Sequence, residues 1–136
     1  MILDRDTKLV ETFRGDSGEF WVTFEDDPTG YEIIFSVRPR AKKSEPIIVK
    51  RYSVANMITV GDSPFPNRLK IEFTPHETGL FKPLMRYEDY YWGVKVRNYE
   101  GTYIRTVVPR GYNKPNPIFR VYSDIVDNGG CGCHGW

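Results

Sequence analysis

The most reactive side chains of the sequence lie together near its end, in the motif Cys131-Gly132-Cys133-His134. Two thiolates and one imidazole could ligate a soft metal such as zinc. Structural zinc sites, however, have four ligands and usually separate paired cysteines by two to four residues. Because this motif is incomplete and too closely spaced, we predict no metal site within one chain and no cofactor. A free or oxidisable tail is expected, and a metal site shared by several chains is the alternative.

The other histidine, His76, is the only imidazole outside that motif. Covalent catalysis needs a nucleophile, a general base and a group that orients the base. The sequence contains no G-x-S-x-G motif, Walker loop or H-E-x-x-H motif to supply them. We therefore predict that the protein is not an enzyme and that His76 lies in a surface turn. A small hydrolase using His76 would need a second titratable group beside it in a pocket.

Positive charge concentrates around one predicted loop, where Glu45 is accompanied by Arg38, Arg40, Lys42, Lys43, Lys50 and Arg51. Nucleic-acid binding would combine such a cluster with stacking aromatic rings. The net charge of the chain is only +1, so no long-range field would attract nucleic acid or an anionic membrane. No apolar run approaches the roughly 20 residues of a membrane helix. We expect a solvated loop or contact with an acidic protein, and neither nucleic acid nor membrane as a partner.

Aromatic residues make up 15% of the chain, a share that favours pleated strands and would also suit a carbohydrate-binding surface. In the run Tyr90-Tyr91-Trp92, alternation would turn Tyr90 and Trp92 towards a core and Tyr91 outward. A carbohydrate-binding β-sandwich module is the alternative function. It would need coplanar exposed rings, for which the candidates are Tyr91, Tyr99, Tyr103 and Tyr112.

Hydrophobic alternation with a period of two recurs along the chain between turn sequences, and convincing helices are absent. We predict strands at residues 8–13, 19–25, 31–38, 47–52, 57–60, 68–74, 89–99, 102–108 and 118–122. One helical turn is expected within 75–80, and 81–88 should be irregular. Seven to nine short strands predict an all-β fold, an immunoglobulin-like antiparallel β-sandwich. We expect one domain over 1–126 and a flexible Gly/Cys-rich tail over 127–136.

The alternation also predicts which side chains share the core, since every second residue of a strand faces the same side. The predicted set is Phe20, Val22, Phe24, Ile33, Phe35, Val37, Leu69, Ile71, Phe73, Trp92, Val94 and Val96. Trp21 falls between these positions, among the polar side chains of the opposite face.

A sandwich must protect the edge strands of its sheets, or use them to bind a partner. The segment 47–52 is the best candidate for such a docking edge, because it is short, follows Pro46 and is apolar at Ile47, Ile48 and Val49. Its charges, which include Lys50 and Arg51, should discourage pairing with an identical copy and favour an acidic partner. We expect Ile48→Lys to leave folding nearly intact and to prevent docking.

The order of these motifs resembles the N-terminal domain of phage baseplate upper proteins, an immunoglobulin-like module of phage and prophage tail proteins. The resemblance covers roughly residues 10–125 and rests on turns and alternation, in Arg14-Gly15-Asp16, Phe20-Trp21-Val22-Thr23-Phe24, Ile71-Glu72-Phe73-Thr74-Pro75-His76-Glu77-Thr78-Gly79-Leu80, Tyr90-Tyr91-Trp92-Gly93-Val94-Lys95-Val96 and Ile118-Phe119-Arg120-Val121. The segment 81–88 departs from the family by its greater length.

The resemblance implies a non-catalytic structural protein of a phage or prophage virion, an adaptor or docking module of a tail or baseplate. It also implies other virion structural proteins as partners, and a location in the virion after synthesis in the bacterial host cytoplasm. For the isolated chain we expect a monomer or a weak homo-oligomer.

Overall fold

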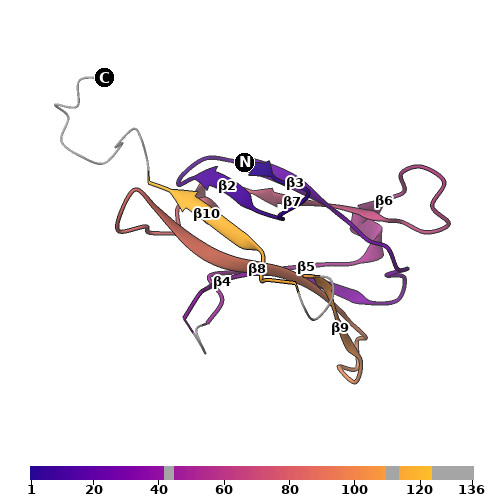
Figure 1. Ribbon diagram of the computed structural model, residues 1–136. Helices are drawn as coiled ribbons and strands as arrows, with labels where there is room; N and C mark the ends of the chain where they lie inside the picture. Colours follow the sequence, from indigo (N-terminus) through magenta and orange to yellow (C-terminus); the bar gives the residue numbers. More distant parts are fainter. Residues whose placement is uncertain (42–44, 110–113, 124–136) are drawn as a thin grey trace.

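The computed structural model describes residues 1–41, 45–109 and 114–123, which form two β-sheets packed face to face (Figure 1). Strands take up 47% of the chain and helices 6%, so the fold is an all-β sandwich, as predicted. The larger sheet has the strand order β1-β2-β10-β8-β4-β5, with β9 also paired to β8. The smaller sheet has the order β3-β7-β6. No helix among the described residues is long and apolar enough to cross a membrane.

The predicted strands are all present, with ends that shift by a few residues. They are β2 (Val10–Phe13), β3 (Gly18–Thr23), β4 (Glu32–Pro39), β5 (Ile48–Tyr52), β6 (Met57–Ile58), β7 (Arg68–Phe73), β8 (Tyr87–Arg97), β9 (Ile104–Val108) and β10 (Ile118–Tyr122). A further short strand, β1 (Ile2–Leu3), precedes them and was not predicted. A 3-10 turn, η1 (Val54–Asn56), lies between β5 and β6, and the predicted helical turn is α1 (Pro75–Thr78).

One strand pair departs from the expected antiparallel arrangement. Strands β2 and β10 run parallel, with Val10 opposite Phe119 and Phe13 opposite Tyr122, whereas the other paired strands are antiparallel. Strand β10 therefore lies between β2 and β8 in the middle of the larger sheet (Figure 1). The larger sheet is consequently mixed, and strands from the two ends of the described chain lie side by side in it.

The core between the sheets contains every hydrophobic residue that alternation predicted for it. Phe35 is fully buried and touches three other rings, with centroids 5.9 Å from Phe20, 5.8 Å from Phe73 and 6.0 Å from Trp92. Aromatic pairs at these spacings add to the stability that burial alone provides. The core also includes residues that the prediction omitted: Val10, Ile48, Met57, Phe81, Tyr90, Val108, Phe119 and Val121.

Phe81 lies in the irregular segment between α1 and β8, yet it is fully buried. Its ring centroid lies 4.9 Å from that of Tyr90 and 5.3 Å from that of Phe119. The segment is further fixed by Arg14, whose Nε donates a hydrogen bond to the Phe81 carbonyl at 2.8 Å. The segment predicted to be irregular, 81–88, is so only as far as residue 86, because β8 begins at Tyr87, and its first residue belongs to the core.

The helical turn α1 directly follows β7 and precedes the irregular segment that leads to β8. Thr74 and Glu77 form a reciprocal capping box, in which each side chain accepts a hydrogen bond from the backbone of the other. The buried Thr78 hydroxyl donates to the Asp16 carbonyl at 2.8 Å and accepts from the Gly15 amide at 3.0 Å. These bonds hold α1 against the turn between β2 and β3.

Candidate binding surface

Three aromatic rings form a row across the outer face of the larger sheet. Phe13 of β2, Tyr122 of β10 and Tyr87 of β8 lie directly opposite one another in the strand register. The ring centroids of Phe13 and Tyr122 are 5.4 Å apart, and those of Tyr122 and Tyr87 are 5.6 Å apart. Phe13 and Tyr87 are exposed and Tyr122 is half-buried. We call these three residues the aromatic row.

The row exists because the three strands turn alternate residues outward. On β10, Phe119 and Val121 enter the core, which leaves Arg120 and Tyr122 on the outer face. Cross-strand packing of rings restricts their rotation, since neighbouring side chains on adjacent strands lie within contact distance. The aromatic row is therefore a fixed feature of the sheet surface.

Charged residues occupy the same outer face two positions away from the aromatic row, where Arg120 of β10 lies opposite Glu11 of β2 and Asp89 of β8. Arg120 donates two hydrogen bonds to the Asp89 carboxylate, at 2.7 and 3.0 Å, and its guanidinium carbon lies 4.6 Å from the centre of the Tyr87 ring. The Tyr122 hydroxyl donates to Glu11 at 2.6 Å. The bonds to Asp89 raise the pKa of Arg120, and the bond to Glu11 raises the pKa of Tyr122. These groups orient the aromatic row and leave no free acid–base pair.

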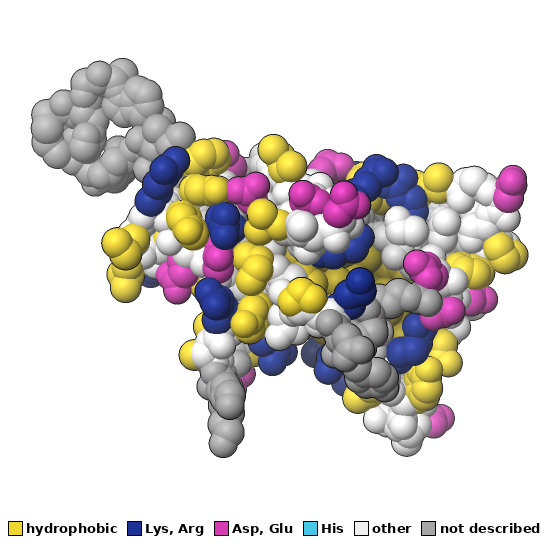
Figure 2. All heavy atoms as spheres, in the orientation of Figure 1, with side chains coloured by type: hydrophobic (Ala, Val, Ile, Leu, Met, Phe, Trp, Pro, Cys, Tyr) yellow, Lys and Arg dark blue, Asp and Glu magenta, His cyan; other side chains and the backbone are white. Residues whose placement is uncertain are grey.

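An open hollow of about 880 Å³ adjoins the aromatic row at the start of β8. It is lined by residues 39–41, residues 85–89 and Tyr91. The guanidinium of Arg40 lies 5.7 Å from the centre of the Tyr91 ring, so the end of β4 also faces this space. Figure 2 shows hydrophobic and basic side chains intermingled, with a few acidic ones, over the left end of the molecule, where β8 begins and β10 ends.

The segment that leads into β8 adds two strongly exposed apolar side chains to this end of the molecule. Leu84 and Met85 are 96% and 78% exposed. Their backbone is nevertheless anchored, because the Ser123 amide donates to the Arg86 carbonyl at 2.9 Å and the Ser123 hydroxyl donates to the Met85 carbonyl. The aromatic row, the hollow and this apolar segment form one continuous candidate binding surface.

The predicted docking edge occupies the expected place, but its side chains do not face as expected. Strand β5 is an edge strand of the larger sheet, as predicted. Ile48, however, is only 6% exposed and belongs to the core, whereas Val49 is 44% exposed. The expectation that Ile48→Lys would leave folding nearly intact is therefore wrong. Ile47 is partly buried and packs against the core.

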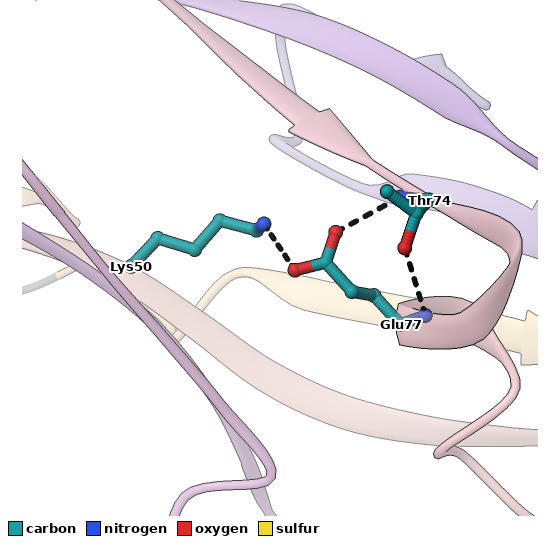
Figure 3. Close-up of polar contacts among 3 residues, drawn as sticks. All are labelled: Lys50, Thr74 and Glu77. Carbon is teal, nitrogen blue, oxygen red and sulfur yellow. Dashed lines mark hydrogen bonds and ion pairs between the residues drawn. The ribbon is translucent and has the colours of Figure 1, made fainter.

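The charged residues of β5 are already engaged within the chain. Lys50 extends inward from β5 and forms an ion pair with Glu77 of α1 (Figure 3). Its ammonium also lies 5.2 Å from the centre of the Phe73 ring. Burial alone would raise the pKa of Glu77, but hydrogen bonds from Lys50 and the Thr74 backbone outweigh it and lower that pKa. Arg51 donates to Glu32 at 2.5 Å. An inward-pointing charge of this kind protects an edge strand from pairing.

The tyrosines considered for carbohydrate binding do not gather in one place. Tyr91 lines the hollow, whereas Tyr99 and Tyr103 follow the opposite end of β8, where the Tyr103 ring packs 5.6 Å from Tyr31. Tyr112 lies outside the described residues. Sequence reasoning thus found one ring of the candidate surface and missed the aromatic row, although alternation on β10 would have turned Tyr122 outward.

The predicted metal and catalytic candidates add no site to this surface. Cys131, Cys133, His134 and the whole segment 127–136 lie outside the described residues. His76 is an exposed residue of α1. Within the part of the chain that the structure describes, no three histidine, cysteine or acidic side chains are grouped as a metal site would need. Of the basic cluster, Lys42 and Lys43 also fall outside this part.

Comparison with known proteins gives no relative from which a function could be transferred. No protein-family model, curated protein or solved structure matches this chain. Arguments about its function therefore start from the sequence and from the candidate binding surface itself.

Proposed function

We propose that this chain is a non-catalytic docking module, a structural protein of a phage or prophage particle that joins other virion proteins in the tail or baseplate. The observation that carries the docking role is the aromatic row with its flanking exposed apolar segment. The assignment to a virion follows from the sequence resemblance over residues 10–125.

The composition of the surface supports protein contact. Tyrosine, phenylalanine, methionine and arginine are enriched in the centres of protein–protein interfaces, where a few such residues contribute most of the binding energy. Here Phe13, Tyr87, Met85 and Arg120 meet on one end of the sheet. Since cross-strand packing already orders the rings, a partner would immobilise few additional side chains, which reduces the entropic cost of binding.

The inward-pointing Lys50 supports the proposal that the isolated chain is a monomer or a weak homo-oligomer. A bare edge would let β5 of two copies pair, but the ion pair between Lys50 and Glu77 places a charge where a new strand would need apolar neighbours. Docking would then depend on the candidate surface and on many copies in a particle. Interfaces of about 1,200–2,000 Å² are sufficient when symmetry repeats them.

The first test is mass spectrometry of purified particles from the induced source, in which the protein should be present. Absence from the particles would overturn the virion role. The second test compares Phe13→Ser, on the aromatic row, with Ile58→Ser, an exposed apolar residue of the smaller sheet. Both variants should fold, and only Phe13→Ser should lose incorporation. Equal incorporation of the two variants would exclude the aromatic row as the docking surface.

A further inference from the structure

We propose that the hollow is the receiving site for an extended acidic segment of the partner protein, which adds to the open edge of β8 as a short strand. This inference rests on the proposed docking function and names the chemistry of the partner. Its basis is a gap in the larger sheet, together with the charges that surround it.

The gap arises because β4 ends before β8 begins. The last β4–β8 pair joins Pro39 to Tyr90, so no residue of β4 lies beside Tyr87, Glu88 or Asp89. The hollow, lined by residues 39–41 and by the start of β8, lies at this place. A continuation of β4 would fill it, and an incoming segment could take the same position.

The hydrogen-bonding pattern shows which backbone groups face the gap. Neighbouring residues of an antiparallel strand bond to opposite sides in turn. Arg86 accepts from Ser123 and Trp92 donates to Pro117, so even-numbered residues of β8 bond towards β10. The amides and carbonyls of Tyr87 and Asp89 therefore point to the other side, into the gap. Among the described residues, none is seen to bond there to the two backbone groups of Tyr87 or to the Asp89 amide, whereas the Asp89 carbonyl faces the Arg40 amide at the end of the β4–β8 ladder.

The charged residues that line the hollow favour an acidic segment as its ligand. Arg40 and Arg86 come from the two chain segments that line the hollow, and neither has a carboxylate partner among the described residues. The acidic residues of the hollow are engaged, because Asp89 is bound by Arg120 and Glu88 lies against the Tyr90 hydroxyl. Guanidinium groups form short, strong hydrogen bonds with carboxylates. Acidic side chains of the incoming strand would thus find two free cations.

The ring of Tyr87 belongs both to the hollow and to the aromatic row, and Tyr91 lines the hollow farther along β8. Strand addition supplies affinity through main-chain hydrogen bonds, while alternate side chains supply specificity. An incoming strand would place every second side chain on the outer face, beside Tyr87, Tyr91 and Arg40. The partner would therefore be recognised by its extended backbone, its acidic side chains and its contact with these rings.

The experiment uses the full chain labelled with nitrogen-15 and a blocked peptide, Glu-Val-Glu-Val-Glu, at millimolar concentration. We expect amide shifts concentrated at Tyr87 and Asp89, together with slower hydrogen exchange of these two amides. The same peptide with alternate N-methylated residues, which lacks the donors for strand pairing, should bind at least about tenfold more weakly. Lys-Val-Lys-Val-Lys should not bind.

Single substitutions test which cationic side chains bind the acidic peptide. Arg40→Gln or Arg86→Gln should weaken peptide binding about tenfold, whereas Lys95→Gln, which removes an exposed cation farther along β8, should leave it unchanged. Absence of shifts at Tyr87 and Asp89, or equal binding of the N-methylated peptide, would overturn the proposal. Tighter binding of trigalacturonate or oligothymidylate would also overturn it, in favour of a saccharide or nucleic acid. Peptide binding by a chain absent from particles would reject the virion role alone.

Discussion

The orientation of the edge strand β5 can be tested by placing the same lysine at two consecutive positions. Ile48 faces the core opposite Val37 of β4, whereas the next residue, Val49, faces outward opposite Ser36. Ile48→Lys removes an apolar side chain whose burial contributes about 1.5–3 kcal/mol. It also brings an ammonium group towards the core, at a cost that the edge position reduces because the long side chain can extend to water. We expect a total loss of about 3–5 kcal/mol.

Val49→Lys, in contrast, should change the free energy of unfolding by no more than about 0.5 kcal/mol, as is usual for surface substitutions. For a domain of this size, 1 kcal/mol corresponds to a shift of roughly 3–5 °C in Tm. Ile48→Lys should therefore lower Tm by about 10–20 °C, and Val49→Lys by no more than about 2 °C. Thermal unfolding followed by circular dichroism measures both. If the two variants melt together, or in the reverse order, the register of β5 is shifted by one residue.

Three further predictions follow from burial and from the ionisable groups. Phe35→Ala and Trp92→Ala should each lower the free energy of unfolding, measured in guanidinium, by about 3–5 kcal/mol, and Phe35→Leu should lower it less. A loss below about 1 kcal/mol for either alanine variant would contradict the observed core. The pKa of Glu77 is lowered in the fold, so its stabilising effect is complete above its ordinary value of 4.5 and is lost as the pH falls through the folded pKa. Glu77→Gln should therefore flatten the loss of stability measured between about pH 5 and pH 3, and an unchanged pH profile would show that the bonds of this carboxylate to Lys50 and to the Thr74 backbone contribute nothing. Burial, followed by the charge of Glu88, raises the pKa of Tyr90 from 10.0 to about 12, so stability should decline as the pH rises from 10 towards 12; ultraviolet titration of Tyr90→Phe should lack one late-titrating phenol.

The core was predictable because it depends on local alternation. In β7, apolar residues alternate strictly with charged ones, and in β3, β4 and β8 most of the positions between the core residues are polar, with Trp21, Ile34 and Tyr91 as exceptions. This alternation fixes the phase of each strand without knowledge of its neighbours. Phe81 escaped this argument because its segment has no period at all. Its burial depends on Tyr90 and Phe119, which belong to strands that the sequence cannot place beside it.

The edge strand shows where alternation fails. Ile47, Ile48 and Val49 form a continuous apolar run, so the pattern does not show which of them faces inward. The side that Lys50 faces is likewise hidden from the sequence, because its partner Glu77 lies 27 positions away in the turn α1. Exposure of Ile48 was therefore a guess about phase, and the structure reverses it.

The candidate surface was harder to predict because it combines residues from three distant parts of the chain. Phe13, Tyr87 and Tyr122 meet only through the parallel pairing of β2 with β10 and the pairing of β10 with β8. Nothing in the local sequence specifies these pairings. Alternation could have turned each of the three side chains outward, but only the strand order brings them into one row.

The parallel pairing of β2 with β10 also constrains the order of events during synthesis. Strand β2 leaves the ribosome well before β10, the neighbour that joins it to the rest of the larger sheet, because β10 lies roughly a hundred residues later in the chain. At typical translation rates of about 5–20 residues per second, β2 waits about 5–20 s for that neighbour. During this interval Val10 and Thr12, both buried in the finished fold, have no place in the larger sheet. The smaller sheet and the β4–β5 hairpin can form beforehand, so assembly of the sandwich would finish with the insertion of β10 between β2 and β8.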